Sequence, residues 1–297
     1  MCPTVAETPT RTITIRPLVR GAYDIQKLRI ETGNRLVANF KVVLGQAPGK
    51  SEDEELDESA KALLAELRAT YKKIAETVAA HPRAPFRGEG VIATYTQYAL
   101  VGQYLDLERV EKEHFARLEK VLQDYPIWMD YLSGIRGIGP AMAAVLISEI
   151  DIAKARTPSS LWKYAGLDVV VNDDGVGEGR SRKAHHLIDV TYMNRRHEET
   201  TRKSITFNPW LKTKLFVLAT SFMKSGGPYK DIYDGYKHRL ECHPLHAQKT
   251  KGHRHSMAMR HMIKLFLVDL YKTWRAMEGL PVSPPYAEAK LGIVHHA

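Results

Sequence analysis

Residues 132–150 read Leu132-Ser-Gly-Ile-Arg-Gly-Ile-Gly-Pro-Ala-Met-Ala-Ala-Val-Leu-Ile-Ser-Glu-Ile150, an apolar segment interrupted by three glycines. Glycine permits positive φ and close backbone approach, so Gly137 and Gly139 predict a tight turn. Pro140 suits the first position of a helix, where its missing N–H has no partner to lose. The segment therefore predicts a turn followed by a helix of small apolar residues.

The backbone amides of this turn are expected to point outward from the N-terminus of the new helix. Such amides have no partner inside the helix, and they attract anions. The pattern resembles a helix-hairpin-helix, a motif that grips one phosphate of a DNA backbone without reading its sequence. The alternative is a tight turn between two core helices. In the first interpretation the contacts come from Arg136, Gly137, Ile138, Gly139 and Ala141.

The positive charge lies in one half of the chain. Residues 1–127 contain 18 Lys and Arg against 18 Asp and Glu, whereas residues 128–297 contain 25 against 16. The net charge of +9 therefore accompanies the glycine turn, as do eleven of the thirteen histidines. A basic half favours a polyanionic partner. The alternative is a charge that serves solubility alone.

Cysteine usage and apolar runs indicate the compartment. Two cysteines, Cys2 and Cys242, are typical of a reducing cytosol and form no disulfide framework. The start of the chain lacks the apolar core of a signal peptide, and no apolar run reaches the length of a membrane span. The sequence predicts a cytoplasmic protein without a membrane partner.

Helical periodicity runs through most of the chain, with a capping box at Ser51 and Glu54 and a break at His81-Pro82. A short strand at Thr12–Ile15 and a β-hairpin over 168–180 are also indicated, whereas 225–252 reads as irregular. A short helix is expected to be capped by Ser159 and closed by Gly166. Longer helices are expected over 21–44, 51–80, 97–124, 140–153, 183–198, 208–224 and 253–278.

These elements predict a mainly α fold in four parts. Residues 1–50 form an N-terminal segment with one helix, and 51–127 form a long helical hairpin. Residues 128–278 form a basic domain that contains the glycine turn and a small β-hairpin, and 279–297 form a Pro-rich tail. The two long helices of 51–127 pair with each other, or they form a coiled coil with a second copy of the chain.

The residues from Gly134 to Leu167 carry a family resemblance. Ile135-Arg-Gly-Ile-Gly-Pro140, Ala143-Ala-Val-Leu-Ile-Ser-Glu-Ile150 and Trp162-Lys-Tyr-Ala-Gly-Leu167 resemble the C-terminal domain of the DEDD insertion-sequence transposases. These are relatives of the Piv and MooV invertases, and some are guided by a bridge RNA. The likeness covers about residues 100–275 and continues through Gly179–Lys183, Asn208-Pro209, Tyr233–Leu240 and Arg260–Tyr271.

The resemblance also implies features that this chain does not repeat. The family carries an N-terminal RuvC-like domain in which four acidic residues bind divalent metal, but residues 1–96 show no α/β alternation. Asp24, Glu31 and the acidic run 52–58 are expected on helix surfaces or in a helix cap. We therefore assign no metal ligands to them.

The family's nucleophilic serine follows the Ala-Gly-Leu, where this chain has Asn172-Asp-Asp-Gly175. Ser181 is the nearest hydroxyl. Its neighbours Arg180, Arg182 and Lys183 can lower its pKa or hold a phosphate. We expect these residues to position DNA, with nucleophilic attack by Ser181 as the alternative.

Other basic and metal-binding residue types gather later in the chain. Lys251 and Arg254 precede the last predicted helix and are expected to contact phosphates. Arg195, Arg196, Arg202 and Lys203 precede Trp210 and suggest the same partner. The segment 238–255 is rich in His and Cys, which are zinc ligands, but its spacing matches no common zinc pattern.

The sequence thus predicts a DNA-binding protein of the transposase or recombinase type that contacts the backbone without reading bases. By resemblance, structured RNA is a further partner, and a homodimer or higher oligomer is the expected assembly. No cofactor is expected for binding, whereas strand cleavage would need Mg²⁺. Two alternatives remain: an active transposase or recombinase that cleaves and transfers strands, and a structural helical adaptor.

Overall fold

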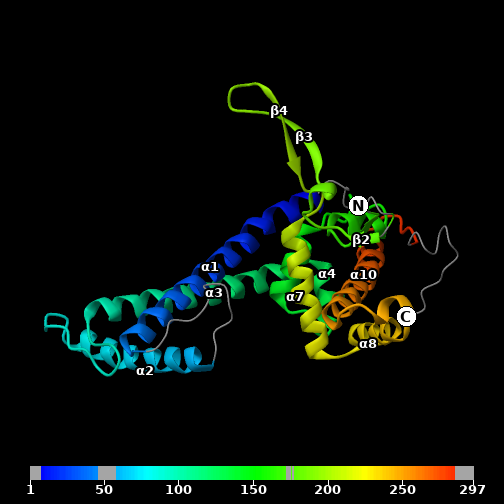
Figure 1. Ribbon diagram of the computed structural model, residues 1–297. Coiled ribbons are helices and arrows are strands. Elements are labelled where there is room, and N and C mark those ends of the chain that lie inside the picture. The colour runs from blue at the N-terminus through cyan, green and yellow to red at the C-terminus, as the bar shows by residue number, and fades with distance from the viewer. Residues whose placement is uncertain (1–7, 46–57, 172–174, 176, 285–297) are drawn as a thin grey trace. The chain divides into compact units, whose positions relative to one another are not determined.

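The computed structural model describes residues 8–45, 58–171, 175 and 177–284, with side chains from residue 14 onward. Its helices are α1 (Thr8–Val43), α2 (Glu58–Ala80), α3 (Tyr95–Leu122), α4 (Pro126–Met129), α5 (Pro140–Glu149), α6 (Pro158–Tyr164), α7 (Pro209–Ser225), α8 (Pro228–Cys242), α9 (Pro244–Ala247) and α10 (Lys251–Met277). The predicted mainly α class is confirmed (Figure 1).

Two antiparallel hairpins and two 3₁₀ turns accompany the helices. Strand β1 (Val169–Val171) pairs with β2 (Gly177–Gly179), and β3 (Ile188–Met193) pairs with β4 (Glu199–Ser204). The 3₁₀ turns are η1 (Leu132–Gly134) and η2 (Ala184–His186). The first hairpin lies where the sequence predicts one, although residues 172–174 of its turn lie outside the described part.

Internal contacts divide the chain into two compact units. The helical unit comprises residues 17–120, and the basic unit comprises residues 1–16 and 121–297. Most of α1 therefore belongs to the same unit as α2 and α3. None of the described helices combines the length and the apolarity needed to cross a membrane.

The helical unit is a bundle of α1, α2 and α3. Tyr23 meets Phe115 edge to face, and the Cβ that Gly33 lacks would touch Tyr104, so α1 and α3 run antiparallel. Helix α2 also runs antiparallel to α3. Arg68 pairs with Glu108, and further along, Tyr71 stacks on Tyr98. The shared core contains Phe40, Leu67 and Val101 among other apolar residues.

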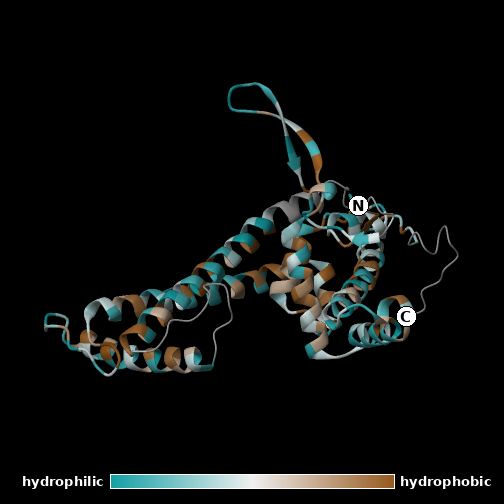
Figure 2. Ribbon diagram, viewed as in Figure 1, coloured by the Kyte–Doolittle hydropathy of each residue, from teal (hydrophilic) through white to brown (hydrophobic). Residues whose placement is uncertain are grey.

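The basic unit is built around α5. Residues 143–150 are buried on all sides of this short helix, and the small Ala143 and Ala144 let its neighbours approach closely. Helix α7 packs on α5, and α10 packs on α6, α7 and α8. Asn208 caps the start of α7, and its side-chain amide donates to the buried Glu149 at 2.6 Å. This hydrogen bond links the start of α7 to the end of α5. Figure 2 shows apolar residues along the helices of this unit, interspersed with hydrophilic ones.

Two expectations from the sequence are wrong about secondary structure in the basic unit. Residues 183–198 form η2, β3 and a turn instead of a helix, because Ile188, Val190 and Tyr192 alternate with the two-residue period of a strand. Residues 225–252 contain α8 and α9 instead of irregular chain. Pro228 and Pro244 occupy the first positions of these helices, where proline favours a helix start.

Smaller expectations also differ at helix termini. Thr12–Ile15 lie within α1 and not in a strand. Thr157, instead of Ser159, caps α6, in a reciprocal capping box with Ser160. Gly166 closes α6 as predicted, with φ at 65°. The predicted capping box at Ser51 and Glu54 lies outside the described residues.

Candidate nucleic-acid interface and serine site

The glycine turn joins η1 to α5. Gly137 has φ at 96°, as predicted, whereas Gly139 has an extended backbone with φ at −94° and serves as the N-cap of α5. Ile138 donates its N–H to Ile135. Among the described residues, the N–H groups of Gly137, Gly139 and Ala141 have no acceptor. The element before the turn is one 3₁₀ turn after the four-residue α4, so the first arm of the expected helix-hairpin-helix is short.

One side of this turn packs inside the protein. Ser221 of α7 donates to the carbonyl of Gly137 at 2.7 Å. A Cβ at Gly137 would lie 2.7 Å from Ser225 Oγ and 3.0 Å from Phe222 Cδ1, whereas a Cβ at Gly139 would meet nothing within 4 Å. Gly137 is therefore required by packing, and only Gly139 and the exposed Arg136 face open space. Ile138 is buried, so its side chain belongs to the core.

Ser181 belongs to a chain of three polar side chains. Its N–H donates to Nδ1 of His186 at 2.9 Å, and its Oγ lies 3.0 Å from the same nitrogen. The His186 ring is fully buried, and its Nε2 lies 3.0 Å from the Glu178 carboxylate, off the straight line of a hydrogen bond. Glu178 lies in β2, and His186 is the last residue of η2. These two short elements bring the three residues together.

The hydrogen bonds define the protonation of His186. A backbone N–H can only donate, so Nδ1 accepts and carries no proton in the neutral ring. The remaining proton then sits on Nε2 and faces Glu178. Lys183 and His185 hold the other contacts of Glu178, and their hydrogen bonds lower the pKa of this carboxyl to about 2. The site therefore keeps an ionised carboxylate beside the imidazole at neutral pH.

A metal ion fits these groups poorly. Glu178, His185 and His186 offer ligand atoms within 4.8 Å of one another, the one such group found within the described ranges. His186 would have to bind through Nε2 as an imidazolate, because Nδ1 already accepts from Ser181. Lys183 also neutralises Glu178. The arrangement is instead that of a serine beside a base that is oriented by a carboxylate.

The structure separates the other predicted DNA contacts into two groups. Arg182 and Lys251 are exposed, and within the described part of the chain they form no ion pair. Arg180 is largely enclosed, binds both oxygens of Asp168 and donates to Thr206. Arg254 donates to the carbonyls of Ala247 and Lys249 at the end of α9. The last two side chains therefore hold the fold together.

The His- and Cys-rich segment 238–255 is dispersed over three helices. Cys242 lies 3.7 Å from His238 at the end of α8, and His255 of α10 lies 2.7 Å from the hydroxyl of Tyr233. In the described residues this segment forms no group of three close ligand atoms. His238 and His255 thus contact different side chains on different helices.

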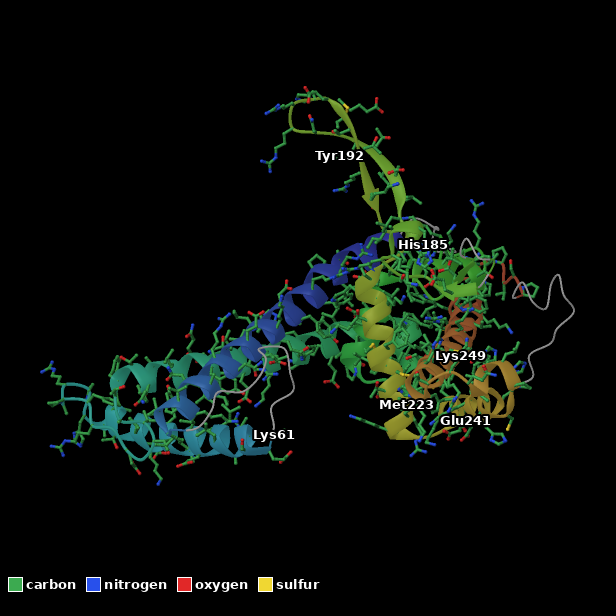
Figure 3. The ribbon with its side chains drawn as sticks, viewed as in Figure 1. Lys61, His185, Tyr192, Met223, Glu241 and Lys249 are labelled. Atoms are coloured by element: carbon green, nitrogen blue, oxygen red, sulfur yellow. The ribbon has the colours of Figure 1, made fainter. Side chains whose placement is uncertain are left out.

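The hairpin of β3 and β4 replaces part of the helix predicted over 183–198, which covers β3 but not β4. It extends away from the helices of the basic unit, with Tyr192 on the ribbon and His185 at its base (Figures 1 and 3). Nearly every residue of both strands is exposed. Arg195 and Arg196 are exposed in the loop, which Figure 2 shows as hydrophilic. Arg202 lies over the ring of Tyr192 at 5.0 Å.

Residues 129–187 match the model of the Transposase IS116/IS110/IS902 family. This part of the chain is a transposase-related domain. No curated protein and no solved structure matches the chain. The transposase-related domain includes the glycine turn, α5, α6, the first hairpin and all members of the serine site. Both features therefore lie within the segment that carries the family likeness.

Proposed function

We propose that the chain is a DNA-binding protein of the transposase type and that its basic unit grips the phosphate backbone. The observation that carries the proposal is the place of the glycine turn inside the matched range 129–187. There the N–H groups of Gly139 and Ala141 lack acceptors among the described residues, and the exposed Arg136 flanks them. Amides at a helix start and a nearby guanidinium are suited to an anion.

The hairpin of β3 and β4 supports the same partner. A two-stranded ribbon fits the major groove of duplex DNA, and phosphates favour basic side chains along it. The ribbon presents Arg195, Arg196 and Arg202 to solvent. These contacts read the backbone and not the bases, so we propose affinity without sequence preference. Structured RNA offers the same phosphates and is a second ligand to test.

A gel-shift series at increasing salt tests the proposal. Affinity should fall with a slope of ~0.9 per neutralised phosphate, and Arg136→Gln with Lys251→Gln should flatten that slope. Arg109→Gln with Arg117→Gln removes the same charge from the exposed face of α3 and is the control. Binding that ignores salt, or that responds only to the control pair, contradicts the proposal.

The serine site favours a second candidate function, cleavage and transfer of DNA strands. The observation that favours this function is the distance of 3.0 Å between Ser181 Oγ and His186 Nδ1. In such a step Ser181 Oγ forms a bond to phosphorus while the bond between phosphorus and the oxygen of the leaving strand breaks. The serine proton passes to Nδ1, which gives up its hydrogen bond from the Ser181 N–H, and the leaving oxygen takes a proton from water. Glu178 stabilises the resulting imidazolium. The described part of residues 1–96 is helical apart from loops and one isolated bridge, and it offers no RuvC-like sheet for metal ligands.

A nicking assay on supercoiled DNA with Mg²⁺ or Mn²⁺ separates the two functions. Strand transfer at this site predicts nicking that disappears in Ser181→Ala while DNA binding stays intact. The Ser181 N–H remains in that variant, so the orientation of His186 is preserved. Nicking that survives the substitution rejects Ser181 as the nucleophile, and a lack of nicking in the parent leaves the binding function alone.

A further inference from the structure

Four cationic side chains meet beside the serine site. Arg260 and Lys264 lie one turn apart on α10, Lys212 comes from α7, and Arg180 follows β2. Lys212 donates to the carbonyl of Arg180 at 2.6 Å, and Lys264 lies 4.3 Å above the ring of Trp162. All four are partly enclosed by the protein. We call them the cation cluster.

The charge of the cation cluster is not balanced. Asp168 is the one carboxylate in the described chain that acts on these four residues, and Arg180 already binds both of its oxygens. Burial and repulsion by Arg260 lower the pKa of Lys212 and of Lys264. A partly buried excess of positive charge is unfavourable unless an anion accompanies it.

Arg260 has the strongest need of a partner. Its Nε is buried and has no hydrogen-bond acceptor within the described residues. Its guanidinium lies directly against Gly179, where a Cβ would overlap it. Gly179 has no positive φ, so the absence of a side chain serves this approach and not the backbone conformation. The described part of the chain thus holds a forked donor in place without giving it an acceptor.

We propose that the cation cluster is a phosphate-binding subsite, in which Arg260 and the two lysines hold one backbone phosphate of DNA next to Ser181. Arg260 supplies planar, bidentate donors, and the lysines add compact charges. Arg180 ties the subsite to the serine site, because it precedes Ser181 directly. The inference rests on the proposed function for the identity of the ligand as backbone, but phosphate binding can be measured without DNA.

Thermal unfolding of the full chain with inorganic phosphate, at constant ionic strength, tests the subsite. A ligand of the folded state should raise the melting temperature by roughly 3–6 °C at ten times its dissociation constant. Arg260→Gln should abolish this rise. Without phosphate, Arg260→Gln should melt at or above the parent temperature, because it removes an unpaired charge.

A second variant tests the subsite even if Arg260→Gln fails to fold. Gly179→Ala keeps every charge but displaces the flexible end of Arg260, so it should also abolish the rise. Gly235→Ala, where a Cβ meets open space, and Lys272→Gln, which removes an exposed charge on α10, are the matched controls and should retain it. A rise that persists in both test variants overturns the subsite. So does an Arg260→Gln protein that is destabilised without phosphate, since Arg260 would then be structural.

Duplex DNA distinguishes the source of the phosphate. If the ligand is backbone, Arg260→Gln and Gly179→Ala should each weaken binding of a 20-base-pair duplex about tenfold or more. Unchanged duplex affinity with a lost response to phosphate assigns the cluster to a free anion and rejects the backbone. A response to phosphate in a protein that binds no DNA at all leaves the subsite standing and refutes only the proposed function.

Discussion

Ser181 and His186 are joined by two contacts at one atom. The N–H of Ser181 donates to Nδ1 at 2.9 Å, and the hydroxyl of the same residue lies 3.0 Å from that nitrogen. The backbone contact orients the ring, and the ring in turn faces Glu178. The hydroxyl is therefore next to a base whose geometry does not depend on the hydroxyl itself.

The carboxylate of Glu178 predicts a defined pH dependence of stability. Its folded pKa of about 2 lies below the ordinary value near 4.5, so its ionised form stabilises the fold above pH 4.5. That contribution is lost as pH falls through the folded value. The parent should exceed Glu178→Gln in melting temperature at pH 5, and the gap should close toward pH 2. A gap that widens on acidification contradicts this assignment.

The two glycines of the turn should respond differently to substitution. Gly139→Val places its side chain in open space before the amides of α5, so stability should change little while DNA affinity falls for all sequences alike. Gly137→Ala forces a side chain into positive φ and against Ser225 and Phe222, so it should lower the melting temperature. Calorimetry with gel shifts measures both effects. Gly21→Val, which also places its side chain in open space but lies in α1, is the control. Full DNA affinity in a folded Gly139→Val protein would falsify a phosphate contact at the turn.

The arginines of the hairpin loop should contribute to the salt dependence of DNA binding. Arg195→Gln with Arg196→Gln removes up to two phosphate contacts and should reduce the salt slope by about 2, since each contact contributes ~0.9. The change should be similar for unrelated DNA sequences. An unaltered slope would show that the hairpin loop stays clear of the backbone, whatever the remaining affinity.

Self-association, which the sequence predicts for the long helices, is expected to use exposed leucines. Leu67 of α2 and Leu118 of α3 are 1% and 2% exposed, so Leu67→Asp should unfold the helical unit. Leu28 and Leu100 are 47% and 37% exposed and line the same surface hollow. Leu28→Asp with Leu100→Asp should lower the mass seen in sedimentation while helix content stays constant. A parent protein that remains monomeric at high concentration contradicts the expectation.

Features set by neighbouring residues could be read from the sequence. The start of α5 at Pro140, the end of α2 before His81-Pro82 and the closure of α6 at Gly166 follow from proline and glycine stereochemistry. The spacing of apolar residues along the sequence predicts α3, α7 and α10 as helices. The transposase-like character of residues 129–187 was also visible, because its glycines, prolines and small apolar residues are close in sequence.

Other features depend on residues that are distant along the chain. Neither the placement of Arg260 against Gly179 nor that of Gly137 against Phe222 of α7 has a local signal. The same holds for Arg180 and Arg254, which look like DNA contacts in sequence but are engaged by internal acceptors. Local sequence sets backbone conformation through short-range sterics, whereas the partners of a long polar side chain are chosen only when packing brings distant elements together.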